Sequence, residues 1–255
     1  MDKNNSHAGR AVFYDKGRAE YPAAFYDWLY GELNISPNAV IADIGPATGK
    51  VTKGFLERGN PVYAVEPDED MMRILQSRLG CYDNCTSIVN FAENTGIPSD
   101  AVDLVFCGNS YEWFERSKVI PEFKRILRSG GPNVVLCNLS EGDPGRQINK
   151  FRAHLNAATS AFTPPAMSRT PNTVAPFRPD CFTTREFIYD VYEDFDMLLN
   201  GSLSSALYSP LPQGSDFDAY RQLFKVSFDK YSRNGKIKCE FKLICMIGNV
   251  DDLAE

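Results

Sequence analysis

The stretch AVIADIGPATGK, residues 39–50, decides the fold, because an apolar run ends at an acid and passes directly into small residues. Val40, Ile41 and Ile44 suit a buried parallel strand. The small residues at positions 45, 47 and 49 let the backbone approach a ligand closely, and residues 50–58 read as a helix. A strand, a small-residue turn and a helix N-terminus together predict a nucleotide site at the carboxyl edge of a doubly wound sheet.

Two phosphate-binding patterns fit this turn poorly. The dinucleotide fingerprint needs G-x-G-x-x-G, whereas the spacing here is Asp43-x-Gly45-x-Ala47-x-Gly49 with Pro46 in the turn, and the Lys-Ser/Thr pair of a P-loop is missing. A carboxylate at the end of the strand would repel a pyrophosphate but can attract the cationic amino-acid portion of a ligand. Asp43 therefore favours a cofactor that carries an amino acid.

The turn resembles the D-x-G-x-G-x-G motif of class I S-adenosylmethionine (SAM) methyltransferases, with Ala47 in place of the middle glycine. The resemblance implies a cofactor held by Asp43, Gly45, Ala47 and Gly49. It also implies an α/β fold, a doubly wound, mostly parallel sheet of seven strands with a helical and loop cap. A structural strand-turn-helix without a ligand is the alternative interpretation of the same stretch.

An acid also ends the second expected strand. Residues 62–65 lead into Glu66, and a helix is expected over 68–79. A carboxylate at this place can accept hydrogen bonds from the 2′ and 3′ hydroxyls of a ribose, so Glu66 predicts an adenosine ligand, although NAD sites use the same device. The sequence EPDEDMM resembles the family's acid-x-x-x-x-Met-Leu pattern, which implies that Met71 packs on adenine. A plain core role for this methionine is equally open.

Two later loops resemble the family's segments beside the adenine and beside the methyl donor. A third strand is expected over 86–91, and FAENTGIP, residues 91–98, resembles the A-E-x-L-P loop, which implies that Ala92 and Glu93 border the adenine. A solvated loop carboxylate is the alternative for Glu93. A fourth strand over 101–107 leads into residues 109–115.

The loop NSYEWFE, residues 109–115, resembles the family's Q-A-F-H-W-F-D stretch. Asn109 stands at the glutamine position and is expected to contact the cofactor. Glu112 stands where the family usually has histidine. A glutamate can still accept a proton in catalysis, so Glu112 is the candidate catalytic residue, with a structural acid as the alternative.

The N-terminal part carries a further resemblance. Residues 14–22, YDKGRAEYP, resemble the family's Y-x-x-x-R-P-x-Y-P segment, with Ala19 in place of proline. By that resemblance Tyr14 and Arg18 reach the carboxylate end of the cofactor, and a solvated surface arginine is the alternative. Apolar residues then recur at helical spacing from Tyr21 to Leu33, which predicts a helix before the first strand.

After the fourth strand, a helix is expected over 117–127, followed by RILRSGG, which resembles the family's R-x-L-x-x-G-G turn, and a fifth strand over 133–138. The remaining expectations are a helix over 148–162, a proline-rich substrate lid or hinge over 163–180, a sixth strand over 187–191, a helix over 217–231 and an antiparallel last strand over 239–247. Residues 201–210 weakly resemble an S-x-S-Y-x-P segment of the same family.

We expect one methyltransferase domain over 1–255. Within it, residues 1–35 form an N-terminal cap segment, 36–140 the cofactor-binding core, 141–235 the cap and lid insertions with strand six, and 236–255 the last strand and tail.

Composition restricts the partners. The net charge of -6 argues against a nucleic-acid substrate, so a small-molecule acceptor is favoured, for a monomer or a homodimer. The polar N-terminus and the lack of an 18-residue apolar run predict a soluble, cytoplasmic protein that does not use a membrane. The seven cysteines read as reduced thiols. Because only two histidines are present, a zinc site at Cys81 and Cys85 lacks further ligands, and no metal is expected.

The function that follows is transfer of a methyl group from SAM to a small molecule by direct displacement, with S-adenosylhomocysteine as the product. Two alternatives stay open. A protein that binds SAM or a nucleotide without catalysis would fit Glu112 and Ala47, and an NAD-dependent oxidoreductase would share Glu66 but needs a pyrophosphate turn that this sequence lacks.

Overall fold

The structure is a computed structural model that describes residues 9–140, 145–159, 175–204 and 214–254. The chain forms two compact units. The sheet unit comprises residues 20–138, 169–187 and 243–255, and the helical unit comprises residues 1–19, 139–168 and 188–242. Each unit is composed of segments that are distant in sequence.

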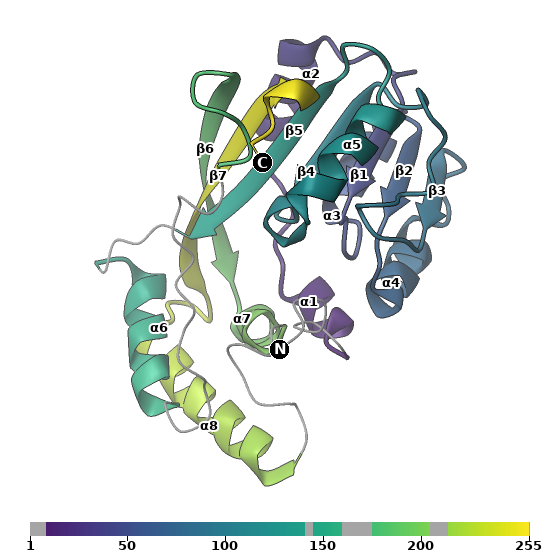
Figure 1. The fold of residues 1–255 in the computed structure, drawn as a ribbon. Coiled ribbons are helices and arrows are strands. Elements are labelled where there is room, and N and C mark those ends of the chain that lie inside the picture. The colour runs from purple at the N-terminus through teal and green to yellow at the C-terminus, as the bar shows by residue number, and fades with distance from the viewer. Residues whose placement is uncertain (1–8, 141–144, 160–174, 205–213, 255) are drawn as a thin grey trace. The chain divides into compact units, whose positions relative to one another are not determined.

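A seven-stranded sheet has the order β3-β2-β1-β4-β5-β7-β6 (Figure 1). Parallel pairs join β1 to β2 and β4, β2 to β3, and β4 to β5, with Ile41 opposite both Val62 and Leu104. The antiparallel part of this mixed sheet lies at its β7 and β6 edge. The strand bounds are Ile41–Ile44 (β1), Val62–Val65 (β2), Cys85–Ile88 (β3), Leu104–Gly108 (β4), Pro132–Ser140 (β5), Phe182–Glu193 (β6) and Ile237–Asn249 (β7). The predicted fold class is confirmed.

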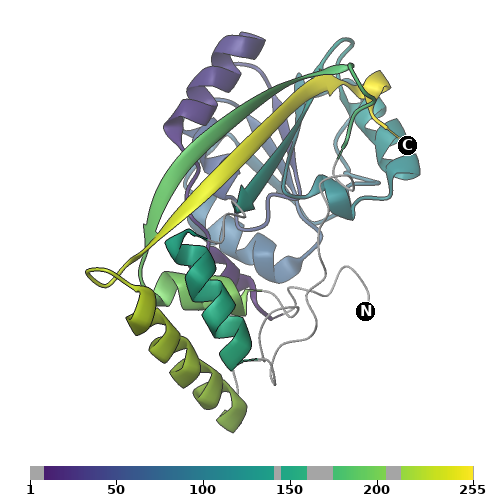
Figure 2. The ribbon, with the colours of Figure 1, turned by 90° about the vertical axis from the view of Figure 1, so that its left-hand side faces the viewer.

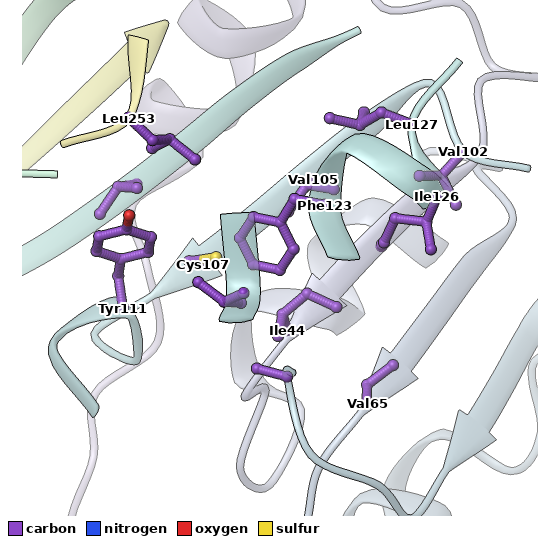
Figure 3. Close-up of a cluster of buried hydrophobic side chains, with 14 of the residues drawn as sticks. Ile44, Val65, Val102, Val105, Cys107, Tyr111, Phe123, Ile126, Leu127 and Leu253 are labelled. Atoms are coloured by element: carbon purple, nitrogen blue, oxygen red, sulfur yellow. The ribbon is translucent and has the colours of Figure 1, made fainter. Parts of the chain in front are cut away.

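Alternation along β4 shows how the two faces of the sheet unit are covered, since successive side chains point to opposite faces. Val105 and Cys107 belong to a buried apolar cluster with Phe123 and Ile126 of α5 (Arg116–Ile126), and Figure 3 shows these side chains together with Ile44. Helix α5 therefore covers one face.

Phe106, between Val105 and Cys107, points to the other face. Its ring centroid lies 6.2 Å from that of Phe25 in α2 (Ala23–Leu33) and 5.1 Å from that of Phe55 in α3 (Lys50–Leu56). Edge-to-face and tilted aromatic contacts of this kind stabilise a core beyond the area that they bury. Helix α4 (Glu69–Leu79) completes the sheet unit.

The helical unit has its own core. Its helices are α1 (Ala11–Lys16), α6 (Gln147–Ala158), α7 (Phe195–Leu203) and α8 (Gly214–Tyr231). Phe151 of α6 and Phe224 of α8 have ring centroids 5.2 Å apart, and the two helices lie side by side in Figures 1 and 2. Helices α1 and α7 approach so closely that a Cβ on Gly17 would lie 2.1 Å from the backbone N of Gly201. Only glycine fits at this contact.

Several predicted bounds need correction. Strand β3 ends at Ile88 rather than at residue 91, and Val89 and Phe91 are half exposed. Strand β6 extends well beyond the predicted 187–191. Helices α1 and α7 were not predicted.

The predicted lid over 163–180 lies mostly outside the described residues, as do the end of the helix predicted over 148–162 and part of the segment 201–210. The described end of the lid segment is fixed within the sheet unit, because the N–H of Arg178 donates to the carbonyl oxygen of Asp252 at 2.8 Å. None of the described helices combines the length and the apolar character needed to cross a bilayer.

Candidate functional site

The turn after β1 adopts the backbone conformation that its small residues predict. Gly45, Ala47 and Gly49 have φ values of 72°, 51° and 79°, in the left-handed region that favours glycine. A Cβ on Gly45 would lie 2.6 Å from Cβ of Ser110, and one on Gly49 would lie 2.7 Å from Cδ1 of Leu79. Ala47 adopts the same region with a side chain, which explains why glycine suits this position better.

Asp43 lies at the end of β1, and its side chain is 1% exposed. Oδ2 accepts a 2.7 Å hydrogen bond from the hydroxyl of Thr52 in α3, whereas Oδ1 has no hydrogen-bond partner among the described residues. Burial raises the pKa of Asp43 to about 7; the Thr52 hydrogen bond opposes this shift and the Glu66 charge adds to it. A buried acceptor without a partner is costly, so Asp43 is suited to a polar or cationic ligand.

Glu66 follows β2 and connects it to the turn. Oε2 accepts from the N–H of Ala47 at 2.9 Å, and Oε1 accepts from the N–H of Asp68 at 3.1 Å. A carboxylate offers about four acceptor positions, so two remain for two hydroxyl donors. Burial raises the pKa of Glu66 to about 7; the N–H groups of Asp68 and Ala47 lower it and the Asp68 charge raises it.

The residues after β4 are held next to the same turn. The hydroxyl of Ser110 donates to the carbonyl oxygen of Ile44 at 2.7 Å. Asn109 has a φ of 53°; its Oδ1 accepts from the N–H of Asn138 at 2.7 Å and its Nδ2 donates to the hydroxyl of Tyr21 at 3.0 Å. Asn109 thus joins the ends of β4 and β5 to the segment before α2.

Glu112, the candidate catalytic residue, is half-buried in the 3-10 helix Tyr111–Trp113. Burial raises the pKa of the nearby Cys107 thiol well above its usual range, and the charges of Asp43 and Glu112 add to this shift. The charges of both carboxylates therefore raise the pKa of the same thiol at the end of β4. This protonated, buried thiol is part of the core rather than a nucleophile.

Three predicted adenine residues have different surroundings. Met71 in α4 and Ala92 are 3% and 5% exposed, so Met71 is already packed in the sheet unit. Glu93 is partly exposed, and its Oε1 accepts a 2.8 Å hydrogen bond from the N–H of Glu115. A role at the adenine stays a prediction for each of them.

Tyr14 and Arg18 belong to the helical unit, whereas the other predicted cofactor residues belong to the sheet unit. The guanidinium carbon of Arg18 lies 4.9 Å from the centre of the Tyr14 ring, and Nη2 donates to the hydroxyl of Ser204 at 3.4 Å. The structure brings these two side chains together, and their role toward a cofactor stays a prediction.

Sequence reasoning missed three residues of the site: Thr52, Ser110 and Tyr21. For Thr52 a signal existed, because a carboxylate that ends a buried strand needs a donor from the helix that follows. Ser110 and Tyr21 lie within the motif segments 109–115 and 14–22, but their partners Ile44 and Asn109 are distant in sequence and cannot be read from those motifs.

A separate cavity of about 380 Å³ lies at the amino ends of β1 and β4, lined by residues that include Asn34, Asp103 and Pro132. None of the predicted site residues lines it. It lies at the amino ends of the strands, whereas the turn follows their carboxyl ends, so this cavity is not part of the candidate site.

Comparison with known proteins agrees with the order of strand, turn and acid described above. A family model for the methyltransferase domain matches residues 42–135. Residues 42–135 are therefore similar to a methyltransferase domain. An uncharacterized methyltransferase of Mycobacterium tuberculosis is 34% identical over 130 residues, which cover 51% of each chain. A malonyl-[acyl-carrier protein] O-methyltransferase of Methylococcus capsulatus is 33% identical over 131 residues, covering 49% of this chain and 47% of that protein.

Solved structures extend the likeness of the fold beyond the methyltransferase domain. A type II methyltransferase from Anaeromyxobacter dehalogenans superposes with a TM-score of 0.62 at 19% identity, covering 91% of this chain and 98% of that chain. At this identity the likeness concerns the fold alone. The chain spans about half the length of the curated relatives that it matches.

Proposed function

We propose that this protein transfers a methyl group from SAM to a small-molecule acceptor. The observation that carries the proposal is Glu66, a buried carboxylate at the end of β2 that holds the Ala47 N–H and keeps acceptor positions for two more donors. This is the acceptor arrangement that the two hydroxyls of a ribose require.

The neighbouring residues fit the rest of SAM. The Oδ1 of Asp43, without a partner among the described residues, suits a cationic group, and the partly exposed turn at Gly45, which carries no side chain, lets a ligand approach the backbone closely. A pyrophosphate would be repelled by the Asp43 carboxylate. When bound, SAM supplies a methyl group on a positively charged sulfur.

The contribution of the chain to the transfer is positioning. Holding donor and acceptor in line and excluding water can supply on the order of 7–11 kcal/mol of the barrier. Glu112, next to the end of β4, is the residue proposed to accept a proton from an acceptor that must lose one. Tyr14 and Arg18 are proposed to bind the carboxylate end of the cofactor, and Asn109 to shape the wall beside it.

The acceptor is proposed to be a small molecule because the net charge is -6. The names of the relatives do not decide this, since one is a malonyl-[acyl-carrier protein] O-methyltransferase and another is a ribosomal RNA small subunit methyltransferase A of Clostridium botulinum. The protein is proposed to act in the cytoplasm.

Titration calorimetry with SAM, S-adenosylhomocysteine and NADH tests the cofactor. Binding of the first two and not of NADH is expected, and binding of NADH alone would overturn the proposal. Incubation with methyl-labelled SAM and fractionated metabolites, followed by mass spectrometry, then separates the enzyme from a protein that only binds. The latter would bind SAM and label nothing.

A further inference from the structure

The middle of the loop over 91–98 is hydrogen-bonded to helix α5. The N–H and the hydroxyl of Thr95 donate to Oε1 of Glu122 at 2.8 and 2.6 Å. Arg125 forms an ion pair with the same carboxylate at 2.7 Å, and its Nη2 donates to the carbonyl oxygen of Ile97 at 2.8 Å. Thr95 is fully buried and Glu122 is 8% exposed, so the two bonds from Thr95 to the carboxylate are shielded from water and strong, whereas the Arg125 side chain is 38% exposed.

A further contact of the same loop reaches the N-terminus of α5. Oε1 of Glu93 accepts a 2.8 Å hydrogen bond from the N–H of Glu115, which is the N-cap residue of α5 and makes no side-chain cap of its own. A carboxylate at this end of a helix is stabilised by the helix dipole. Glu93 therefore supplies, through an exposed hydrogen bond, the carboxylate acceptor that the N-cap side chain of α5 does not provide.

The contact also fixes the chain on the other side of Glu115. The preceding residues are the loop over 109–115, which carries Glu112 in its 3-10 helix. Loop 109–115 is fixed at its start by the Ser110 bond to Ile44 and at its end by the Glu93 bond to Glu115. Between these two points lies the candidate catalytic residue.

We propose that Glu93 is a positioning residue, whose carboxylate holds the N–H of Glu115 and thereby sets the position of loop 109–115 from the loop over 91–98. Only the expectations that residues 91–98 border the adenine and that Glu112 in loop 109–115 takes part in catalysis rest on the proposed function. The effect of Glu93 on loop 109–115 rests on contacts within the sheet unit.

This role differs from the one that family resemblance gives to Glu93, a direct contact to the adenine amino group. The two roles predict different behaviour. A positioning residue affects loop 109–115 even when no ligand is present. An adenine ligand affects the preference for an amino group at the purine and leaves the empty loop unchanged.

Hydrogen exchange without ligand is the first measurement, on the wild type and on Glu93→Ala, Glu93→Gln and Glu115→Ala. We expect exchange at the amide of Glu115 to accelerate at least about 10-fold in Glu93→Ala, relative to the amides of α4 in the same sample. Glu93→Gln keeps an acceptor oxygen and should restore most of the protection. Glu115→Ala keeps the backbone N–H and should match the wild type.

The second measurement compares the Kd for S-adenosylhomocysteine with the Kd for its deaminated analogue, in which oxygen replaces the adenine amino group. The ratio of the two constants should be the same in Glu93→Ala and in the wild type. Unchanged exchange at Glu115 in Glu93→Ala would overturn the proposal, as would a ratio that falls to about one. The exchange result stands even if neither compound binds, a result that would instead contradict the proposed function.

Discussion

The hydroxyl of Thr52 donates to Oδ2 of Asp43 at 2.7 Å, and both side chains are at most 1% exposed. Thr52 lies in α3, nine residues after Asp43, so one helical side chain reaches back across the turn to the strand that precedes it. The bond orients the carboxyl group and leaves Oδ1 without a partner among the described residues. Its stabilising effect is smaller than the cost of burial, because the pKa of Asp43 still rises to about 7.

We expect the free energy of unfolding to depend on pH through Asp43. A carboxyl whose pKa is higher in the folded than in the unfolded protein binds more protons when folded. Its contribution is therefore complete below about pH 4 and is lost as the pH rises through about 7. Asp43→Asn keeps an acceptor for Thr52 but does not titrate. Relative to this variant, the free energy of unfolding of the wild type should fall by a few kcal/mol between about pH 4 and about pH 7.

Urea unfolding of both proteins at a series of pH values measures this difference. Glu66 titrates in the same range, with its pKa also raised to about 7, but it is present in both proteins. Parallel pH profiles would show that Asp43 has the same pKa in the folded and the unfolded protein.

Replacing Glu66 should weaken binding of S-adenosylhomocysteine. Glu66→Ala removes a charged acceptor for two hydroxyls, which corresponds to about 1.5–3 kcal/mol, and also releases the N–H groups of Ala47 and Asp68. Calorimetry with Glu69→Ala as the matched control, an exposed glutamate at the start of α4, isolates the effect. An unchanged Kd would remove Glu66 from the cofactor site.

Alanine at Gly45 should destabilise the sheet unit more than alanine at Gly130. Both residues have a positive φ, 72° and 81°, so both variants carry the strain of about 1–2 kcal/mol that left-handed backbone imposes on alanine. The new Cβ at Gly45 would lie 2.6 Å from Cβ of Ser110, whereas at Gly130 it meets open space. Thermal unfolding compares the two, and equal losses would mean that Ser110 moves aside freely.

Local sequence was sufficient where one segment carried the whole signal. β2 has the predicted bounds, and α4 begins after Asp68, whose side chain accepts from the N–H groups of Asp70 and Met71. Helix α7 had a comparable signal that was overlooked, since Asp194 caps it through the N–H of Met197 just before an apolar run. Such short capping patterns can be recognised from the sequence alone.

The rest depended on contacts between distant segments. The Asn109 amide holds both Tyr21 and Asn138, which lie 88 and 29 residues away, and no local pattern encodes such a meeting. The same limit applies to Glu93. Its motif predicts an adenine contact and carries no sign of its partner in the structure, a backbone N–H that any residue except proline would supply at position 115. The type of fold was therefore predictable, and the hydrogen bonds that join distant segments within the site were not.

Removing the hydroxyl of Tyr111 should leave stability unchanged or raise it by about 1 kcal/mol. Tyr111 is 2% exposed, its hydroxyl has no partner among the described residues, and Figure 3 shows it within the apolar cluster on the Leu253 side. Tyr26→Phe is the matched control, because the Tyr26 hydroxyl donates to the carbonyl oxygen of Val51 at 3.1 Å and its loss should destabilise the protein. Urea unfolding of both variants gives the comparison. A clear loss in Tyr111→Phe would show that this hydroxyl does form a stabilising hydrogen bond in the folded protein.

The core of the helical unit is shared between two stretches of chain. Ile148, Phe151 and Leu155 come from residues 139–168, whereas Leu199, Phe224 and others come from residues 188–242. Among the described residues, the apolar face of α6 has its partners in the second stretch, as in the contact of Phe151 with Phe224. A chimaera that transplants this unit onto the sheet unit of another protein must therefore carry both stretches, and a natural exchange of residues 188–242 alone would leave α6 with a bare apolar face.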